Sequence, residues 1–202
     1  MSRDMAVSKV REFVDSGEPI VLDIGCGGVK RNPRAVGIDV LEAPDVDLVG
    51  DAREILKLFP DASVSGIETY HFLEHVENVG ELVDEMSRVL RVGSEMKVVV
   101  PHFSNPYYYS DPTHKTPFGL YSLSYFAKSD IFRRGVPSYG RELVLNLERV
   151  DLVFRSPFIG RRPFKFVFQR IFNFNPWLQE FWEENLSGLI PCYEVVFRLR
   201  RC

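Results

Sequence analysis

A predicted strand that runs directly into a glycine-rich turn constrains the fold of this chain more than any other feature. The apolar residues 20–24 predict a buried strand, and Gly25, Gly27 and Gly28 follow it at once. Glycines in such a turn let the backbone approach a ligand closely. The next predicted strand ends at Asp39, where a carboxylate can accept hydrogen bonds from two ribose hydroxyls. This arrangement predicts a site for a nucleoside-containing cofactor.

The spacing of the glycines argues against a dinucleotide. A dinucleotide-binding turn has the pattern G-x-G-x-x-G, which places a helix N-terminus against the pyrophosphate. Residues 23–28 read Asp-Ile-Gly-Cys-Gly-Gly and lack this spacing. The alternative to a cofactor site is a tight turn in which the glycines serve packing alone.

Predicted strands and helices alternate along the first half of the chain. The strands are expected at 20–24, 35–39, 46–49, 65–70 and 96–100, the helices at 2–16, 53–59 and 79–90, and two further strands at 143–154 and 192–199. Such alternation predicts right-handed crossovers and a mainly parallel sheet, which is an α/β, Rossmann-like fold. Residues 1–202 are expected to form a single domain.

Three acids stand at the ends of successive predicted strands, namely Asp23, Asp39 and Asp51. Together with the glycine turn, this ordered set resembles class I S-adenosylmethionine-dependent methyltransferases, whose first motif reads acid-x-Gly-x-Gly-x-Gly. The resemblance covers residues 20–100. It implies S-adenosylmethionine as the cofactor and a seven-stranded, mainly parallel sheet whose last strand is antiparallel.

The same resemblance implies which residues contact the cofactor. Asp39 falls where the family binds the ribose, and Asp51 falls beside the adenine amine. The segment 70–75, Tyr-His-Phe-Leu-Glu-His, matches the part that borders the sulfonium. The implied cofactor-binding residues are Asp23, Gly25, Cys26, Gly27, Asp39, Val40, Asp51, Ala52 and His71.

The link between the glycine turn and the second strand is unusually short. Class I methyltransferases place a helix there, but residues 29–34 are too few to form a sheet-covering helix at ~1.5 Å per residue and return. This link and the sequence Asp-Pro-Thr-His-Lys at 111–115 resemble a small subgroup of the superfamily. Its members are often associated with sugar or glycan pathways, which implies a sugar, a glycan precursor or another small molecule as methyl acceptor.

All four histidines follow the fourth or fifth predicted strand, at the sheet edge where ligands bind in parallel α/β folds. Methyl transfer to a hydroxyl needs a group that accepts its proton, and imidazole suits this task near neutral pH. The candidate catalytic residues are His102 and His114, with Asp111 orienting an imidazole. The alternative is that Asp111 only forms a turn through its own side-chain hydrogen bonds.

A divalent metal site is a further alternative. His71, His75 and His102, with Glu74 or Asp111, are suitable ligand types. His71 is expected to end a strand, however, so the two imidazoles of His71 and His75 would not share a helical face. No metal ligands are therefore assigned.

Composition restricts the partners of the chain. The net charge of −3 provides no basic field for nucleic acid, and no stretch approaches the length of a membrane span. Three cysteines are an odd and sparse set that argues against a disulfide framework. We expect a cytoplasmic protein, and the sequence leaves its oligomeric state open.

Two insertions, at 102–140 and 157–191, are expected to cover the substrate, with short helical pieces at 122–126 and 129–132. Segment 154–177 contains eight aromatic residues, five Lys or Arg and no acid. The alternation of Phe164, Phe166 and Phe168 predicts an extended piece with aromatics on one face and cations on the other. An anionic acceptor, peripheral contact with a lipid-linked substrate, single-stranded nucleic acid, or an aromatic satellite core would each account for it.

The second functional hypothesis is a non-catalytic partner subunit that binds S-adenosylmethionine. The short link after the glycine turn and the lack of a recognisable motif for binding a methyl acceptor leave this hypothesis open. The chain also lacks an Asn/Asp-Pro-Pro-Tyr/Phe element after the fourth strand, and this absence argues against nitrogen methylation of nucleic-acid bases.

Overall fold

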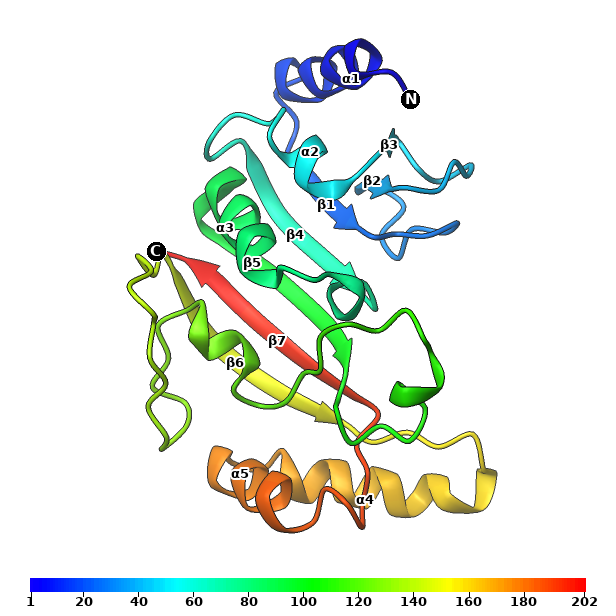
Figure 1. Ribbon diagram of the computed structural model, residues 1–202, viewed down its shortest axis with the longest axis vertical. Coiled ribbons are helices and arrows are strands. Elements are labelled where there is room, and N and C mark those ends of the chain that lie inside the picture. Colours follow the sequence, from blue (N-terminus) through cyan, green and yellow to red (C-terminus); the bar gives the residue numbers. More distant parts are fainter. The chain divides into compact units, whose positions relative to one another are not determined.

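The computed structural model describes residues 1–202, which divide into two compact units (Figure 1). The first unit contains Met1–Phe72, Asn78–Val98 and Arg200–Cys202, and the second contains Leu73–Glu77 and Val99–Leu199. Both predicted insertions lie within the second unit. That they cover a substrate, and that the whole chain acts as a single domain, stay predictions.

Seven strands form one sheet in the order β3-β2-β1-β4-β5-β7-β6. They are β1 Val21–Ile24, β2 Val36–Asp39, β3 Leu48–Val49, β4 Val64–Tyr70, β5 Leu90–Pro101, β6 Leu145–Val153 and β7 Glu194–Arg201. Strand β1 pairs in parallel with β2 and β4, and β2 pairs in parallel with β3. In the second unit, β7 points opposite to β6 (Figure 1). The predicted α/β fold with a mainly parallel, seven-stranded sheet is confirmed.

The helices of the first unit are α1 Arg3–Asp15, α2 Ala52–Leu56 and α3 Val79–Val89. Side chains cap all three, because Ser2, Asp51 and Asn78 each accept a hydrogen bond from a backbone N–H of the first turn. Helix α3 buries the apolar face that the sequence pattern predicts. No helix has the length and apolar character needed to cross a membrane.

Strand β5 begins earlier than predicted, directly after α3. Gly93, three residues after the predicted helix 79–90, lies inside β5 with a φ of +82°. The helix ends at Val89, where the Arg201 guanidinium donates to the carbonyl oxygens of Arg88 and Leu90. These carbonyls therefore find a partner outside the helix, and the chain leaves it four residues before the glycine.

The helices of the second unit correct two further predictions. Residues 162–172 form helix α4 (Arg162–Phe172) and not an extended piece, and α5 (Pro176–Asn185) follows it. Pro163 occupies the first turn of α4, where its missing N–H costs nothing. Residues 122–125 form a 3₁₀ turn as expected, whereas 129–132 contain no helical turn.

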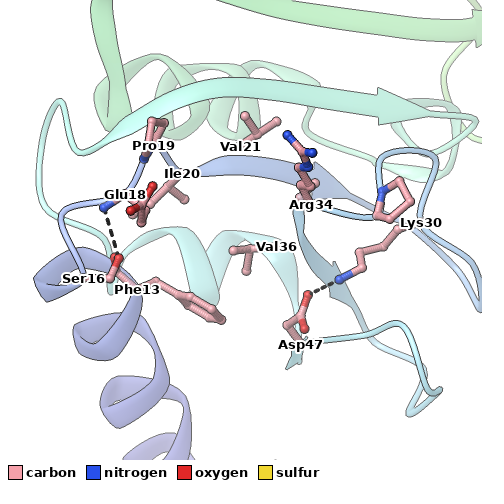
Figure 2. A pocket seen from close by; sticks show the side chains of 12 residues that line it. Phe13, Ser16, Glu18, Pro19, Ile20, Val21, Lys30, Arg34, Val36 and Asp47 are labelled. Atoms are coloured by element: carbon pink, nitrogen blue, oxygen red, sulfur yellow. Dashed lines mark hydrogen bonds and ion pairs between the residues drawn. The ribbon is translucent and has the colours of Figure 1, made fainter.

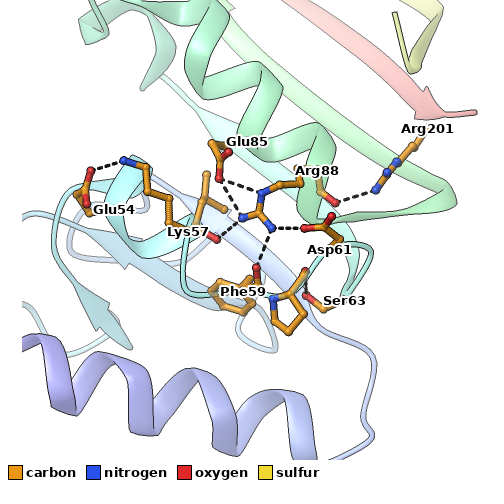
Figure 3. A network of polar contacts seen from close by, with 10 residues as sticks. Glu54, Lys57, Phe59, Asp61, Ser63, Glu85, Arg88 and Arg201 are labelled. Atoms are coloured by element: carbon orange, nitrogen blue, oxygen red, sulfur yellow. Dashed lines mark hydrogen bonds and ion pairs between the residues drawn. The ribbon is translucent and has the colours of Figure 1, made fainter. Parts of the chain in front are cut away.

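A single arginine joins several segments of the first unit (Figure 3). The Arg88 guanidinium donates to the carbonyl oxygens of Leu56 (2.9 Å) and Phe59 (3.0 Å), just where α2 ends. It also donates to the carboxylates of Glu85 (2.9 Å) and Asp61 (2.6 Å). Arg88 therefore satisfies backbone groups that the end of a short helix would otherwise leave without partners.

Replacing Arg88 by alanine is expected to lower the free energy of unfolding by about 2–4 kcal/mol, because two carbonyls and two carboxylates lose a charged donor. Urea unfolding followed by circular dichroism measures this loss. The control is Lys57→Ala, which breaks an exposed ion pair with Glu54 and should change the free energy by less than about 0.5 kcal/mol. Equal changes in the two variants would contradict the role given to Arg88.

Candidate functional site

The glycine turn after β1 is fastened to the end of β2. Gly25 and Gly27 have φ angles of +71° and +60°, which side chains rarely tolerate. The backbone N–H of Gly25 donates to the carbonyl of Ile38 (2.8 Å), and the N–H of Gly27 donates to Oδ2 of Asp39 (2.8 Å). The first and second motifs predicted from the sequence therefore meet directly.

The Asp39 carboxylate is half-buried and keeps capacity to bind a ligand. Its Oδ1 accepts a hydrogen bond from the N–H of Leu41 (2.9 Å). Each oxygen can accept a second hydrogen bond, so two acceptor positions remain after the turn is fixed. Val40, which follows it, exposes its side chain to solvent. The residues thus form an open acceptor site at the carboxyl end of β2.

Asp23 is almost fully buried, and only one of its two carboxylate oxygens has a hydrogen-bond partner. Its Oδ2 accepts a hydrogen bond from the N–H of Arg31 (3.0 Å), while Oδ1 has no partner. Burial raises the pKa of this carboxyl group. Because a buried polar atom without a partner is costly, its retention points to a donor that arrives with a ligand. An ammonium group would suit it.

Two carboxylates hold the helix-free link between β1 and β2 in place. No helix occurs there, as the sequence predicts. Asp45 accepts from the N–H of Lys30 (3.3 Å), and Asp47 pairs with the Lys30 ammonium (2.7 Å) and accepts from the N–H of Gly37 (2.7 Å). Sequence reasoning missed both acids. Their position shortly after β2 could have indicated this role, because the link 29–34 is too short to provide acceptors for its own backbone N–H groups.

The residues after β4 close one side of the glycine turn. His71 has a φ of +53°, an uncommon value for a residue with a side chain and one often found at binding sites. It turns the chain so that the ring of Phe72 packs directly on Gly25. The sequence predicted His71 at this border but did not predict the contact of Phe72.

Replacing Gly25 by alanine is therefore expected to destabilise the protein by about 2–4 kcal/mol, through overlap with Phe72 and strain at positive φ. Gly28→Ala is the matched control. It adds the same methyl group in the same turn, but no heavy atom lies within 4 Å of the new Cβ and φ is not positive. Thermal unfolding of the two variants should differ clearly, and similar melting temperatures would show that the turn tolerates a side chain at residue 25.

The remaining predicted cofactor residues occupy ordinary structural positions. Asp51 caps α2 and pairs with Arg53 (3.0 Å), and hydrogen bonds from this arginine lower the pKa of its carboxyl group. Ala52 is buried in the first turn of α2. Burial raises the pKa of the Cys26 thiol to about 11, which keeps it neutral at physiological pH.

In the second unit, Glu74, His75 and His114 converge. Each contributes one oxygen or nitrogen atom to a group in which all three lie within 4.8 Å of one another. The two imidazole rings have centroids 4.9 Å apart, and Glu74 is buried. His75 was considered only as a ligand in the metal alternative, and the 3₁₀ turn Leu73–His75 brings it against His114.

Asp111 forms the turn of the alternative interpretation and also lies near an imidazole. Its Oδ1 accepts from the N–H (2.8 Å) and the hydroxyl (2.6 Å) of Thr113, which is the turn of the alternative interpretation. These hydrogen bonds lower the pKa of Asp111. Its Oδ2 also lies 3.7 Å from Nε2 of His114, within ion-pair distance.

The hydrogen bonds assign the tautomer of both imidazoles. Nδ1 of His114 lies 2.8 Å from the carbonyl oxygen of Tyr108, which can only accept. Nδ1 of His75 lies 2.9 Å from the hydroxyl of Thr113, whose proton is already donated to Asp111. Both Nδ1 atoms are therefore donors, and both Nε2 atoms can accept a proton or, with Glu74, ligate a divalent cation. Of the histidines in the metal alternative, only His75 belongs to this group.

His102 has a different environment. It is fully buried, with Nε2 3.0 Å from Oε2 of Glu183 and Nδ1 accepting from the N–H of Ser104 (3.1 Å). The same Glu183 oxygen accepts from the N–H of Leu120 (2.7 Å). Both ring nitrogens are used inside the second unit, so this geometry favours a structural role for His102. Glu183 lies 81 positions from His102, and sequence reasoning missed the pair.

A cavity of about 280 Å³ lies elsewhere in the first unit (Figure 2). Val21 and Val36, the first residues of β1 and β2, line it together with Phe13 of α1. It therefore adjoins the beginnings of these strands, whereas the glycine turn follows the end of β1. The cavity is separate from the candidate cofactor site.

Comparisons with known proteins agree with this description. Residues 22–97 match a family model described as a methyltransferase domain. None of the curated proteins matches the sequence. The solved structure of a SAM-dependent methyltransferase from Archaeoglobus fulgidus is similar, with a TM-score of 0.58 and 20% identity over 99% of this chain and 95% of that chain.

Two further structures share the fold. A putative methyltransferase from Bacillus halodurans C-125 has a TM-score of 0.55 and 18% identity, over 96% of this chain and 97% of that chain. Phosphoethanolamine N-methyltransferase 2 from Haemonchus contortus, in complex with S-adenosyl-L-methionine, has a TM-score of 0.53 and 16% identity, over 99% of this chain and 52% of that longer chain. The chain thus has the fold of class I methyltransferases. Its resemblance to a small subgroup stays a prediction.

Proposed function

We propose that this protein is an S-adenosylmethionine-dependent methyltransferase that methylates a hydroxyl group of a sugar, a glycan precursor or another small molecule. The observation that carries the proposal is the fastening of the glycine turn to Asp39 at the end of β2, beside a buried Asp23 oxygen that has no partner. The family match and the fold support it.

The residues of the first unit fit this cofactor. Asp39 has acceptor capacity for the ribose hydroxyls, and the unpaired oxygen of Asp23 suits the ammonium of the amino-acid portion. Asp51 and Ala52 would border the adenine of the cofactor. His71 and Cys26 would border the rest of the cofactor. When bound, the cofactor supplies a methyl group on a sulfonium. The chain's own task is to hold that donor and to accept a proton from the acceptor.

His114 is the residue of the second unit best suited to take that proton. Its Nδ1–H is held by the Tyr108 carbonyl, which leaves the lone pair of Nε2 for a substrate hydroxyl. Asp111, 3.7 Å from Nε2, would stabilise the imidazolium that forms. Both ring nitrogens of His102 already have partners, so we propose no proton transfer by His102.

Radioactive methyl transfer from S-adenosylmethionine to a panel of monosaccharides, nucleotide-sugars and amine-containing acceptors tests the proposal. We expect incorporation into a hydroxyl-bearing acceptor, in a product that resists treatments selective for methylamines. Binding of S-adenosylhomocysteine without transfer to any acceptor would favour the alternative of a non-catalytic partner subunit. Methylation of amines alone would contradict the assignment of a hydroxyl acceptor.

A further inference from the structure

Helix α4 turns large apolar side chains toward solvent. Phe164 and Phe166 are each 66% exposed, whereas Phe172 at the end of the helix is 6% exposed and packs against Phe154 of the same unit. Phe164, Val167 and Ile171 have i, i+3, i+7 spacing and form one exposed stripe along the helix. Ordinary core packing therefore accounts for only part of α4.

The exposed apolar residues continue beyond α4. Helices α4 and α5 follow one another in the second unit, outside β6 (Figure 1), and Asn173 between them is anchored to β6 through Leu152. We call the exposed large apolar side chains of this region the α4–α5 surface: Phe158, Ile159, Phe164, Phe166, Val167, Ile171, Phe174, Trp177, Phe181 and Leu189. Soluble monomers rarely expose such a concentration without a partner.

The charges of α4 and of the residues before it have a single sign, whereas α5 carries Glu180, Glu183 and Glu184. Segment 154–177 contains five Lys or Arg residues and no Asp or Glu, in a chain whose net charge is −3. Arg162 and Arg170 have i, i+8 spacing on α4 and flank Phe166, and the Arg170 guanidinium lies 6.0 Å from the centroid of that ring. Arg161 lies over the ring of Phe158 in the same way, at 5.1 Å. Cations and aromatics therefore alternate across one surface.

We propose that the α4–α5 surface binds a membrane that contains anionic lipids, with α4 lying in the headgroup region. Aromatic and aliphatic side chains would enter the boundary between headgroups and acyl chains, and the arginines would pair with lipid phosphates. The charge of α4 and of the residues before it is uniformly positive. It selects an anionic lipid surface over a contact between the α4 helices of two copies, which would bring like charges together. The inference goes beyond the proposed function and holds whether or not the chain transfers methyl groups.

Co-sedimentation of the full chain with lipid vesicles tests this proposal. We expect binding to vesicles of phosphatidylcholine mixed with phosphatidylglycerol, and at least about tenfold weaker binding to phosphatidylcholine alone. The double variant Phe164→Ser/Phe166→Ser should lose most of the binding. The double variant Arg162→Gln/Arg170→Gln should lose the preference for the anionic vesicles.

The matched control is Met5→Ser/Val92→Ser, which removes two exposed apolar side chains of the first unit and should leave binding unchanged. Circular dichroism checks that each variant folds. Failure of the wild type to sediment with either kind of vesicle would overturn the proposal, as would equal binding by the phenylalanine variant. A dimer of the wild type that the same phenylalanine variant abolishes, without vesicle binding, would instead assign the surface to a second copy.

Discussion

Replacing Asp39 by alanine is expected to weaken binding of S-adenosylhomocysteine by at least about 100-fold. Two ribose hydroxyls would lose a charged acceptor, and each such hydrogen bond is worth about 1.5–3 kcal/mol. The substitution also releases the N–H of Gly27, which fixes the glycine turn. Isothermal titration calorimetry measures the loss, with Glu42→Ala as the control because Glu42 is an exposed acid three residues further along.

A second variant separates loss of the ligand contact from loss of the turn. Asp39→Asn keeps one side-chain oxygen, which can still accept from Gly27, but removes the charge. It also removes the acceptor of the Leu41 N–H, which water can replace because Leu41 is exposed. We expect it to retain the melting temperature of the wild type and still bind S-adenosylhomocysteine at least about tenfold more weakly. Wild-type affinity in both Asp39 variants would show that β2 does not hold the ribose.

Replacing His114 by glutamine is expected to reduce kcat about 100-fold or more with the best acceptor found in the methyl-transfer panel. Glutamine preserves the size and polarity of the side chain but cannot take up a proton near neutral pH. Affinity for S-adenosylhomocysteine should not change, because the residues proposed to hold it all belong to the first unit. Steady-state kinetics and calorimetry on the same preparation test both statements.

Lys115→Ala provides the control for His114. It alters the neighbouring residue, whose ammonium pairs with the exposed Glu77 (2.8 Å), and should leave kcat within about twofold of the wild type, as surface changes usually do. If His114→Gln and Lys115→Ala have equal kcat values, His114 does not accept the proton in the reaction. His75→Gln would then become the next variant to test, since its Nε2 can also accept a proton.

The succession of strands along the chain and the strand-end acids could be predicted from the sequence, because each depends on local patterns. Alternation of buried strands with amphipathic helices predicted the sheet, and it is observed. Helix α4 was predicted wrongly because Phe164, Phe166 and Phe168 alternate over a stretch too short to distinguish periods of 2 and 3.6. Strand β5 begins six residues before its predicted start because residues 91–95 carry no apolar pattern, and pairing with neighbouring strands determines their conformation.

The polar contacts of the site were less accessible to sequence reasoning, since they join distant positions. His75 and Thr113 are 38 residues apart, and His102 and Glu183 are 81 apart. A single sequence offers no signal for such pairs. The contact of Asp45 with the N–H of Lys30 follows from a rule that sequence could have supplied, namely that backbone N–H groups outside a helix still need acceptors.

Calorimetric titration of the wild-type chain with S-adenosylhomocysteine is the most direct test of cofactor binding at the glycine turn. We expect a single site with a dissociation constant in the micromolar range, and loss of that site in Asp39→Ala. Absence of a binding signal at millimolar ligand, with folded protein, would contradict the assignment of the glycine turn as a methyl-donor site.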